Sequence, residues 1–201
     1  MSKHLKILFM LAAGALVALA LTAGLASGKA GHGRHAQREA GRAAAAADPS
    51  TVFSVLAAPR SSADDVDAAM HPSDLPGAST AHRLPAPAGT AMWLSSDGGL
   101  VCLTIKAFNG GGQTCETISW AASHGIAMTL TDPTDGTHVV VGGVVPNGAT
   151  GVALDTDAKT GLRPTLTNHS FAVESHSPTN AWHFTTPAGK ELNLPLASSA
   201  G

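Results

Sequence analysis

HVVVGGVVPNG, residues 138–148, is the stretch of sequence that decides the fold class of this chain. From Val139 to Val145 every residue is either valine or glycine. A strand with one face in solvent alternates apolar and polar residues, so this unbroken run predicts a central strand that is buried on both faces. Gly142-Gly143 within the run predicts a β-bulge. Pro146-Asn147-Gly148 predicts a turn that ends the strand and reverses the chain into residues 150–155.

Short β-type runs separated by turn signals extend from this strand in both directions. Their spacing predicts a mainly β fold, a small antiparallel sandwich or barrel with one or two short helices. The expected strands span residues 80–84, 90–94, 100–107, 126–131, 138–145, 150–155, 162–167, 170–174, 181–185 and 191–194. The turn signals between them, rich in Gly, Pro, Asn and Asp, lie at 97–99, 109–112, 132–136, 146–148, 155–161 and 187–189. Residues 116–124 predict a short helix, because Ile118 and Ala122 have helical spacing and Gly125 follows as a stop.

Composition divides the chain upstream of the β domain into three further parts. Residues 28–50 contain no apolar residue larger than alanine. They cannot bury enough surface to offset the entropy of ordering, so they predict a flexible basic tether. The expected organisation is a transmembrane anchor or signal segment at 1–27, the tether at 28–50, a short helical and irregular lead-in at 51–78, and the β domain at 79–201.

Residues 7–26 (ILFMLAAGALVALALTAGLA) run without a charge. A helix of about 20 residues spans the hydrocarbon core of a bilayer, so this run predicts a transmembrane helix whose partner is the lipid bilayer. A cleaved signal peptide is the alternative, because Gly24-Leu25-Ala26 places small residues where signal peptidase requires them. The four basic residues between 29 and 42 outnumber Lys3 and Lys6 in front of the run, which favours a cytoplasmic body by the positive-inside rule.

The two cysteines favour the opposite side of the membrane. Cys102 and Cys115 lie in two β-type runs joined by a Gly-rich turn, and a close pair of this kind is typical of an oxidising compartment. Free buried thiols and a redox pair are the alternatives, and a redox pair would favour C-x-x-C spacing. We therefore expect a structural disulfide between Cys102 and Cys115, in a body that is extracytoplasmic and membrane-anchored, or secreted if the leader is cleaved.

Short motifs punctuate residues 51–195. They are Val52-Phe53-Ser54-Val55-Leu56 with Pro59, Trp93-Leu94 before a Gly-Gly turn, Val101-Cys102-Leu103 with Cys115, Val144-Val145-Pro146-Asn147-Gly148, and Asn168-His169-Ser170-Phe171. In this punctuation the chain resembles a group of uncharacterised exported or membrane-anchored small β-domain proteins of high-GC actinobacteria. The resemblance implies location and β architecture, and it implies no activity and no catalytic residue.

Charge and motifs disfavour several classes of function. Residues 1–50 carry six basic and two acidic side chains, a net charge of +4, whereas residues 51–201 carry six and twelve, a net charge of −6. An acidic body with few, scattered aromatic residues disfavours nucleic-acid binding. The chain has no Gly-x-Ser-x-Gly, no His-Glu-x-x-His and no Gly-Lys-Ser/Thr phosphate loop. We therefore expect no catalytic residue and no cofactor.

Ten histidines raise the question of a metal site. The best groupings are His32 with His35, and His169, His176 and His183 at intervals of seven. Neither grouping matches a recognised ligand spacing, so we expect no metal ligand. His183 should point to solvent, because alternation places it on the opposite face from Trp182 and Phe184. Residues 155–161 are similar to a calcium loop, but Lys159 stands at the third ligand position, so a hairpin loop is expected there.

These features together predict a non-enzymatic protein: a membrane-anchored extracytoplasmic β domain with a binding, sensing or envelope role. Two alternatives remain open, a secreted hydrolase on the same scaffold and a histidine-dependent metal-binding envelope protein. A pocket that gathers an acid, a base and a nucleophile would favour the hydrolase. Three histidines converging on one point would favour the metal protein.

Overall fold

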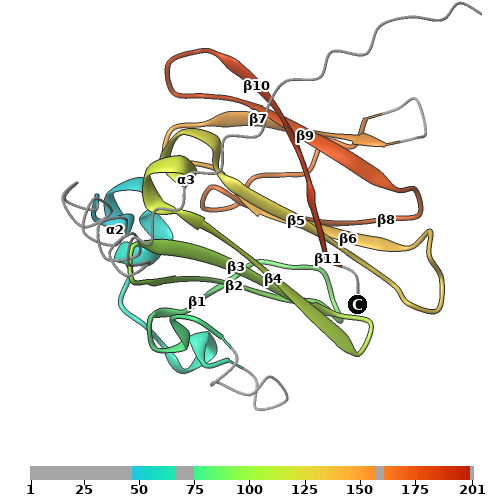
Figure 1. Ribbon diagram of the computed structural model, residues 1–201, viewed down its shortest axis with the longest axis horizontal. Helices are drawn as coiled ribbons and strands as arrows, with labels where there is room; N and C mark the ends of the chain where they lie inside the picture. The colour runs from blue at the N-terminus through green and yellow to red at the C-terminus, as the bar shows by residue number, and fades with distance from the viewer. Residues whose placement is uncertain (1–46, 67–74, 157–160, 200–201) are drawn as a thin grey trace, which may run out of the picture. The chain divides into compact units, whose positions relative to one another are not determined.

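The computed structural model describes residues 47–66, 75–156 and 161–199 (Figure 1). The expected anchor at 7–26 and most of the expected tether at 28–50 lie outside these residues, as do His32 and His35. Within the described ranges, no helix has the length and apolar character needed to cross a membrane.

Strands dominate the described residues, which confirms the mainly β class. They are β1 (His82–Leu84), β2 (Ala91–Asp97), β3 (Leu100–Ala107), β4 (Gly110–Thr117), β5 (Ile126–Thr131), β6 (Val139–Val144), β7 (Thr150–Thr156), β8 (Ser170–Ser175), β9 (Thr179–Thr185), β10 (Glu191–Pro195) and β11 (Ala197–Ser199). The helical elements are α2 (Pro49–Val52), η1 (Ser54–Ala57), η2 (Ser62–Asp64), η4 (Ala78–Thr80) and α3 (Ile118–His124).

The strands form three sheets with the orders β1-β2-β3-β4, β11-β5-β6-β8 and β10-β9-β7. Neighbours are antiparallel throughout, except that β11 pairs in parallel with β5. The sheet of β5, β6 and β8 lies between the other two (Figure 1). The architecture is therefore a three-layer stack, where the sequence predicted a sandwich or barrel without a third layer.

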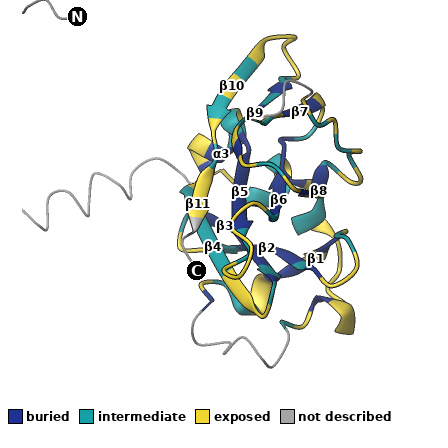
Figure 2. Ribbon diagram, turned by 90° about the vertical axis from the view of Figure 1, so that its right-hand side faces the viewer, coloured by how far each residue is buried: buried dark blue, intermediate teal, exposed yellow. Residues whose placement is uncertain are grey.

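Strand β6 is buried at every position, which confirms the prediction of a central two-sided strand (Figure 2). Val140 and Val144 pack into the core shared with the β1–β4 sheet. Val139 and Val141 point the other way, into the core shared with the β7–β9–β10 sheet. Alternation along one strand thus supplies both hydrophobic cores.

The prediction of a β-bulge at Gly142-Gly143 is wrong, because β6 pairs with β5 and with β8 in unbroken register through both glycines. The glycines have a packing role instead. A Cβ atom on Gly142 would lie 2.5 Å from Met92 Sδ, and one on Gly143 would lie 2.5 Å from the Phe171 ring. Both contacts are shorter than a real Cβ tolerates. The absent side chain of Gly142 allows β2 and β3 to approach β6, whereas the absent side chain of Gly143 leaves room for the Phe171 ring, which comes from β8 of the same sheet.

The disulfide between Cys102 and Cys115 is confirmed. The two residues are direct cross-strand partners in β3 and β4, with Cα atoms 4.1 Å apart. In the loop-entropy model, closing a loop of this length contributes about 3 kcal/mol of stability. Disulfides of this kind are typical of oxidising, extracytoplasmic compartments.

Besides small shifts at strand ends, such as β2 ending at Asp97, the strands differ from the sequence prediction in three regions. Residues 162–167 make only isolated bridges, at Leu162 and Thr167, because the sequence there includes Pro164, which cannot donate to a ladder. A Gly-rich turn was expected at 109–112, but most of these residues belong to strand β4, which begins at Gly110. The turn itself is made by Phe108 and Asn109, which have positive φ. Strand β11 was not expected, because three residues carry too little pattern to detect.

The helical predictions hold in part. Helix α3 confirms the helix expected within 116–124, with Thr117 Oγ1 accepting from the Trp120 N–H at its start and Gly125 (φ 67°) at its end. In the lead-in expected to be short-helical and irregular at 51–78, η1 and η2 are single helical turns, and residues 67–74 lie outside the described ranges. Helix α2 begins at Pro49, two residues before the expected boundary between tether and lead-in.

The packing role of Gly142 generates the first prediction. Gly142→Ala should lower the free energy of unfolding by about 1 to 3 kcal/mol, because the new methyl group overpacks the site against Met92 and Ile105. Gly136→Ala is the matched control, since a Cβ there meets nothing within 4 Å. Urea unfolding of both variants measures the difference. Equal stability of the two would contradict the close-approach account.

Candidate functional site

Three of the motifs quoted from the sequence meet at one place in the fold, here called the lead-in junction (Thr51, Val52, Ser54, Asn147, Gly148 and His169). Asn147 joins them. Its Oδ1 accepts from the Ser54 N–H at 2.9 Å, its Nδ2 donates to the Thr51 carbonyl at 3.1 Å, and its N–H donates to the Val52 carbonyl at 3.0 Å. These bonds, together with the fully buried ring of Phe53, fix α2 and η1 to the end of β6.

Ser54 and His169 also come together at the lead-in junction, and they are the pair most similar to a nucleophile and its base. The Gly148 N–H donates to His169 Nε2 at 3.3 Å. In a neutral imidazole the proton then sits on Nδ1, which lies 3.5 Å from Ser54 Oγ. Ser54 therefore accepts a hydrogen bond from His169 and is not activated by it. The pair has a structural arrangement, not a catalytic one.

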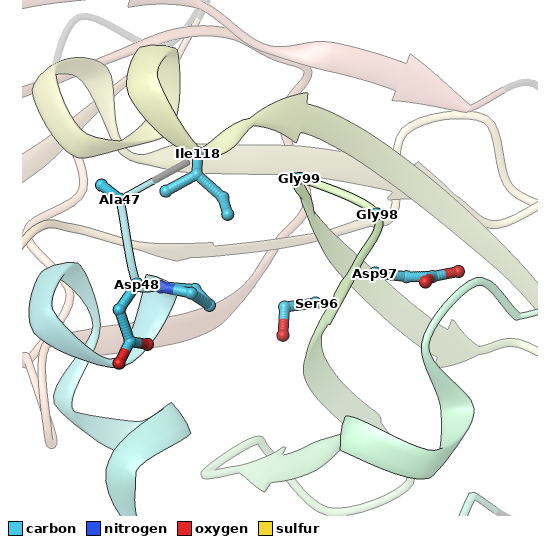
Figure 3. A pocket seen from close by; sticks show the side chains of 8 residues that line it. Ala47, Asp48, Ser96, Asp97, Gly98, Gly99 and Ile118 are labelled. Carbon is cyan, nitrogen blue, oxygen red and sulfur yellow. The ribbon is translucent and has the colours of Figure 1, made fainter. Parts of the chain in front are cut away.

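Two adjoining hollows open between the lead-in and the edge of the β1–β4 sheet. The first, here called the Asp48 hollow, has a volume of about 370 Å³ and is lined by Asp48, Pro49, Ile118 and residues 96–99 (Figure 3). The second, here called the His82 hollow, has a volume of about 530 Å³. It shares Asp48, Pro49 and Ser96 with the first, so the two form one continuous groove.

The two carboxylates of the Asp48 hollow do not act as a pair. Asp48 Oδ1 accepts from both the hydroxyl and the N–H of Ser50, and these bonds lower the pKa of Asp48. The side chain of Asp97 points away from Asp48 across the hollow (Figure 3). General acid–base chemistry on a bound group needs two convergent groups, so this hollow offers surface for binding and no acid–base dyad.

His82 is part of the lining of the His82 hollow and is only 6% exposed. Arg60 lines the same hollow from the lead-in. Arg60 Nε donates to the Ala81 carbonyl at 3.0 Å, and its Nη2 lies 3.3 Å from Asp65 Oδ1. The guanidinium is thereby held beside the hollow while part of it stays exposed to solvent.

Asp64 fastens this side of the lead-in to β1. Burial by itself raises the pKa of Asp64. The Ser61 and Arg83 N–H groups that donate to the carboxylate, the Ser61 hydroxyl and nearby His82 outweigh burial and hold that pKa below its ordinary value. Asp64 is therefore an anion at neutral pH, placed behind His82.

A third hollow, of about 330 Å³, lies along β8. Apolar or hydroxyl-bearing side chains line it, from residues 85–86, 164–165, 167 and 170–173. None of these described lining residues is charged or a histidine. It therefore offers shape without a group that could do chemistry.

The histidines that the sequence grouped at intervals of seven are separated by the fold. His169 lies in the lead-in junction, and His176 stacks on His138 with ring centroids 4.5 Å apart. His183 lies on the opposite face of β9 from Trp182, as expected, and its side chain is 26% exposed.

His183 lies between two carboxylates. Its Nδ1 is 2.9 Å from Glu191 Oε1, and its Nε2 is 3.6 Å from Asp155 Oδ1. Because the acids contact opposite ring nitrogens, the three groups do not converge on one point. Among the described residues no group of three His, Cys, Asp or Glu side chains is arranged to hold a metal ion. Residues 157–160 of the calcium-like loop lie outside the described ranges.

Sequence reasoning missed His82, although a signal was present. In the strand expected at 80–84, alternation places His82 on the same face as Leu84, which is buried in the core. A histidine on the core-facing side of a strand is a candidate for a functional or hydrogen-bonded role. The hollow beside it could not be anticipated, because Arg60, Leu56 and Ser96 reach it from distant parts of the chain.

Comparison with known proteins adds no family: no family model, no curated protein and no solved structure matches this chain.

The turn at 146–148 generates the second prediction. The Ala149 N–H donates to the Pro146 carbonyl at 3.0 Å, and Gly148 has φ 80°, so the expected turn is confirmed. It leads from β6 into β7 of a different sheet, not into a hairpin partner. Gly148→Val should cost about 1 to 3 kcal/mol of stability, because a β-branched residue is strained at positive φ.

Thermal unfolding measures this cost, with Gly136→Val as the control at a glycine without positive φ. Because the turn is assigned a structural role, ligand affinity of the folded protein should be unchanged. Unchanged melting together with abolished binding would make the turn part of a binding site and contradict the assignment.

Proposed function

We propose that this protein is a membrane-anchored extracytoplasmic β domain with a non-enzymatic binding, sensing or envelope role. The observation that carries the proposal is the Cys102–Cys115 disulfide between β3 and β4. Cys102 is fully buried and Cys115 is half-buried, so the bond joins a core residue of β3 to the edge strand β4. Such bonds persist in oxidising compartments and are rare in the cytosol.

The uncharged run at 7–26 supports anchoring of this body to the bilayer. The groove formed by the Asp48 and His82 hollows supports a binding role. Its lining includes Ala47 and Asp48, the first two described residues, together with turns and side chains from separate elements. Binding residues in small β proteins commonly lie on such turns, held in place by a rigid scaffold.

The hydrolase and metal alternatives have less support. Ser54 accepts from His169 Nδ1, so the pair lacks the base-to-nucleophile direction that hydrolysis requires. His138 and His183 approach carboxylates, and His176 stacks on His138, but these contacts lie in separate places. A binding role needs neither arrangement, which is why we favour it.

Fractionation of cells that express the full-length protein tests the proposal. We expect full-length protein in the membrane fraction, accessible to protease added outside the cytoplasm, with neither Cys102 nor Cys115 alkylated before reduction. Deletion of residues 7–26 is the control and should release the protein from the membrane. Protein recovered from the medium with its N-terminus at Ser27 would favour the secreted alternative. Alkylation of both thiols in native protein would move the body to the cytoplasm and contradict the proposal.

A further inference from the structure

His82 is a buried polar side chain that faces a hollow. It lies on the core side of β1 opposite Leu94, where an apolar residue would be expected. Its residue is 6% exposed, and within the described residues no hydrogen bond is made by its ring nitrogens. The ring nitrogens are not closed off from solvent, and His82 lines a hollow of about 530 Å³, so a ligand in this hollow can supply the hydrogen bond that the ring lacks.

The walls of the His82 hollow carry the chemistry of a defined ligand class. Arg60 supplies a guanidinium with donors left over after its bonds to Ala81 and Asp65. Hydroxyl groups of Ser79 and Ser96 line the rim. Leu56 and Ala57 of η1 form an apolar side.

The charges limit the ligand to one negative group. Among the described residues that line the hollow, Arg60 is the sole basic residue besides His82, and Asp48 contributes a carboxylate. A second negative charge on the ligand would meet Asp48 at the rim and the anion of Asp64 behind His82. One carboxylate can pair with Arg60, while hydroxyl groups on the ligand can donate to Asp48 and to the serines.

We propose that the His82 hollow binds a sugar acid, a ring with one carboxylate and several hydroxyl groups. The carboxylate pairs with Arg60, His82 hydrogen-bonds the ligand at the floor, and the ring packs on the apolar side formed by η1. This site deepens the proposed binding function and rests on it.

Isothermal titration of the full-length protein in detergent tests the site, with D-glucuronate as the probe and with D-glucose and acetate as comparison ligands. D-glucuronate should bind and the other two should bind at least about tenfold more weakly, since glucose lacks the carboxylate and acetate lacks the ring and its hydroxyl groups. Arg60→Gln and His82→Asn should each weaken D-glucuronate about tenfold, the usual loss for a charge-assisted or buried hydrogen bond. Arg163→Gln is the matched control, because Arg163 lines none of the three hollows.

A variant that blocks the hollow keeps the test independent of folding. Ser79 is exposed at the rim, so Ser79→Trp should abolish binding without changing the melting temperature. Absence of D-glucuronate binding to the wild-type protein, equal binding of glucose or of acetate, or full binding by Ser79→Trp would each overturn the proposal. None of these outcomes would alter the fractionation and alkylation results, so failure here is distinguishable from failure of the proposed function.

Discussion

The close approach of two sheets onto β6 is the constraint on which the rest of the described structure depends. A strand buried on both faces must leave space for packing on each side, and Gly142 and Gly143 do so on opposite faces. Met92 and Ile105 of the β1–β4 sheet occupy the space on one face, and the ring of Phe171, from β8 of the same sheet as β6, occupies it on the other. The hydrophobic effect then favours three layers, since a two-layer packing would leave one face of β6 in water.

The position of the groove follows from this packing through the lead-in junction. Once β6 is fixed, Pro146 and Asn147 leave it at a defined place, and Asn147 holds the backbone of α2 and η1. The lead-in then lies over the end of the β1–β4 sheet with Phe53 in the core, and the Asp48 and His82 hollows remain between them. The hollows therefore lie where the lead-in meets the β1–β4 sheet, and no single loop forms them.

Local patterns in the sequence predicted most of the strands, the helix α3, the disulfide and the two-sided character of β6, because each depends on neighbours within a few residues or on residue chemistry. The bulge at Gly142-Gly143 was predicted wrongly, because a glycine required by close packing of neighbouring side chains looks the same in sequence as a glycine required by a bent backbone. The candidate site was missed for a related reason. His82 is brought to Arg60 and Ser96 by long-range pairing, and no short window of sequence contains that information.

Native-state hydrogen exchange tests the central role of β6 most directly. If β6 is the shared middle layer of both cores, its amides from Val140 to Val144 should exchange only through global unfolding, and should be the slowest in the described residues. The amides of β9 and β10, in an outer sheet, should exchange faster through local opening. Slower exchange in β9 and β10 than in β6 would place the stable core elsewhere and contradict the three-layer account.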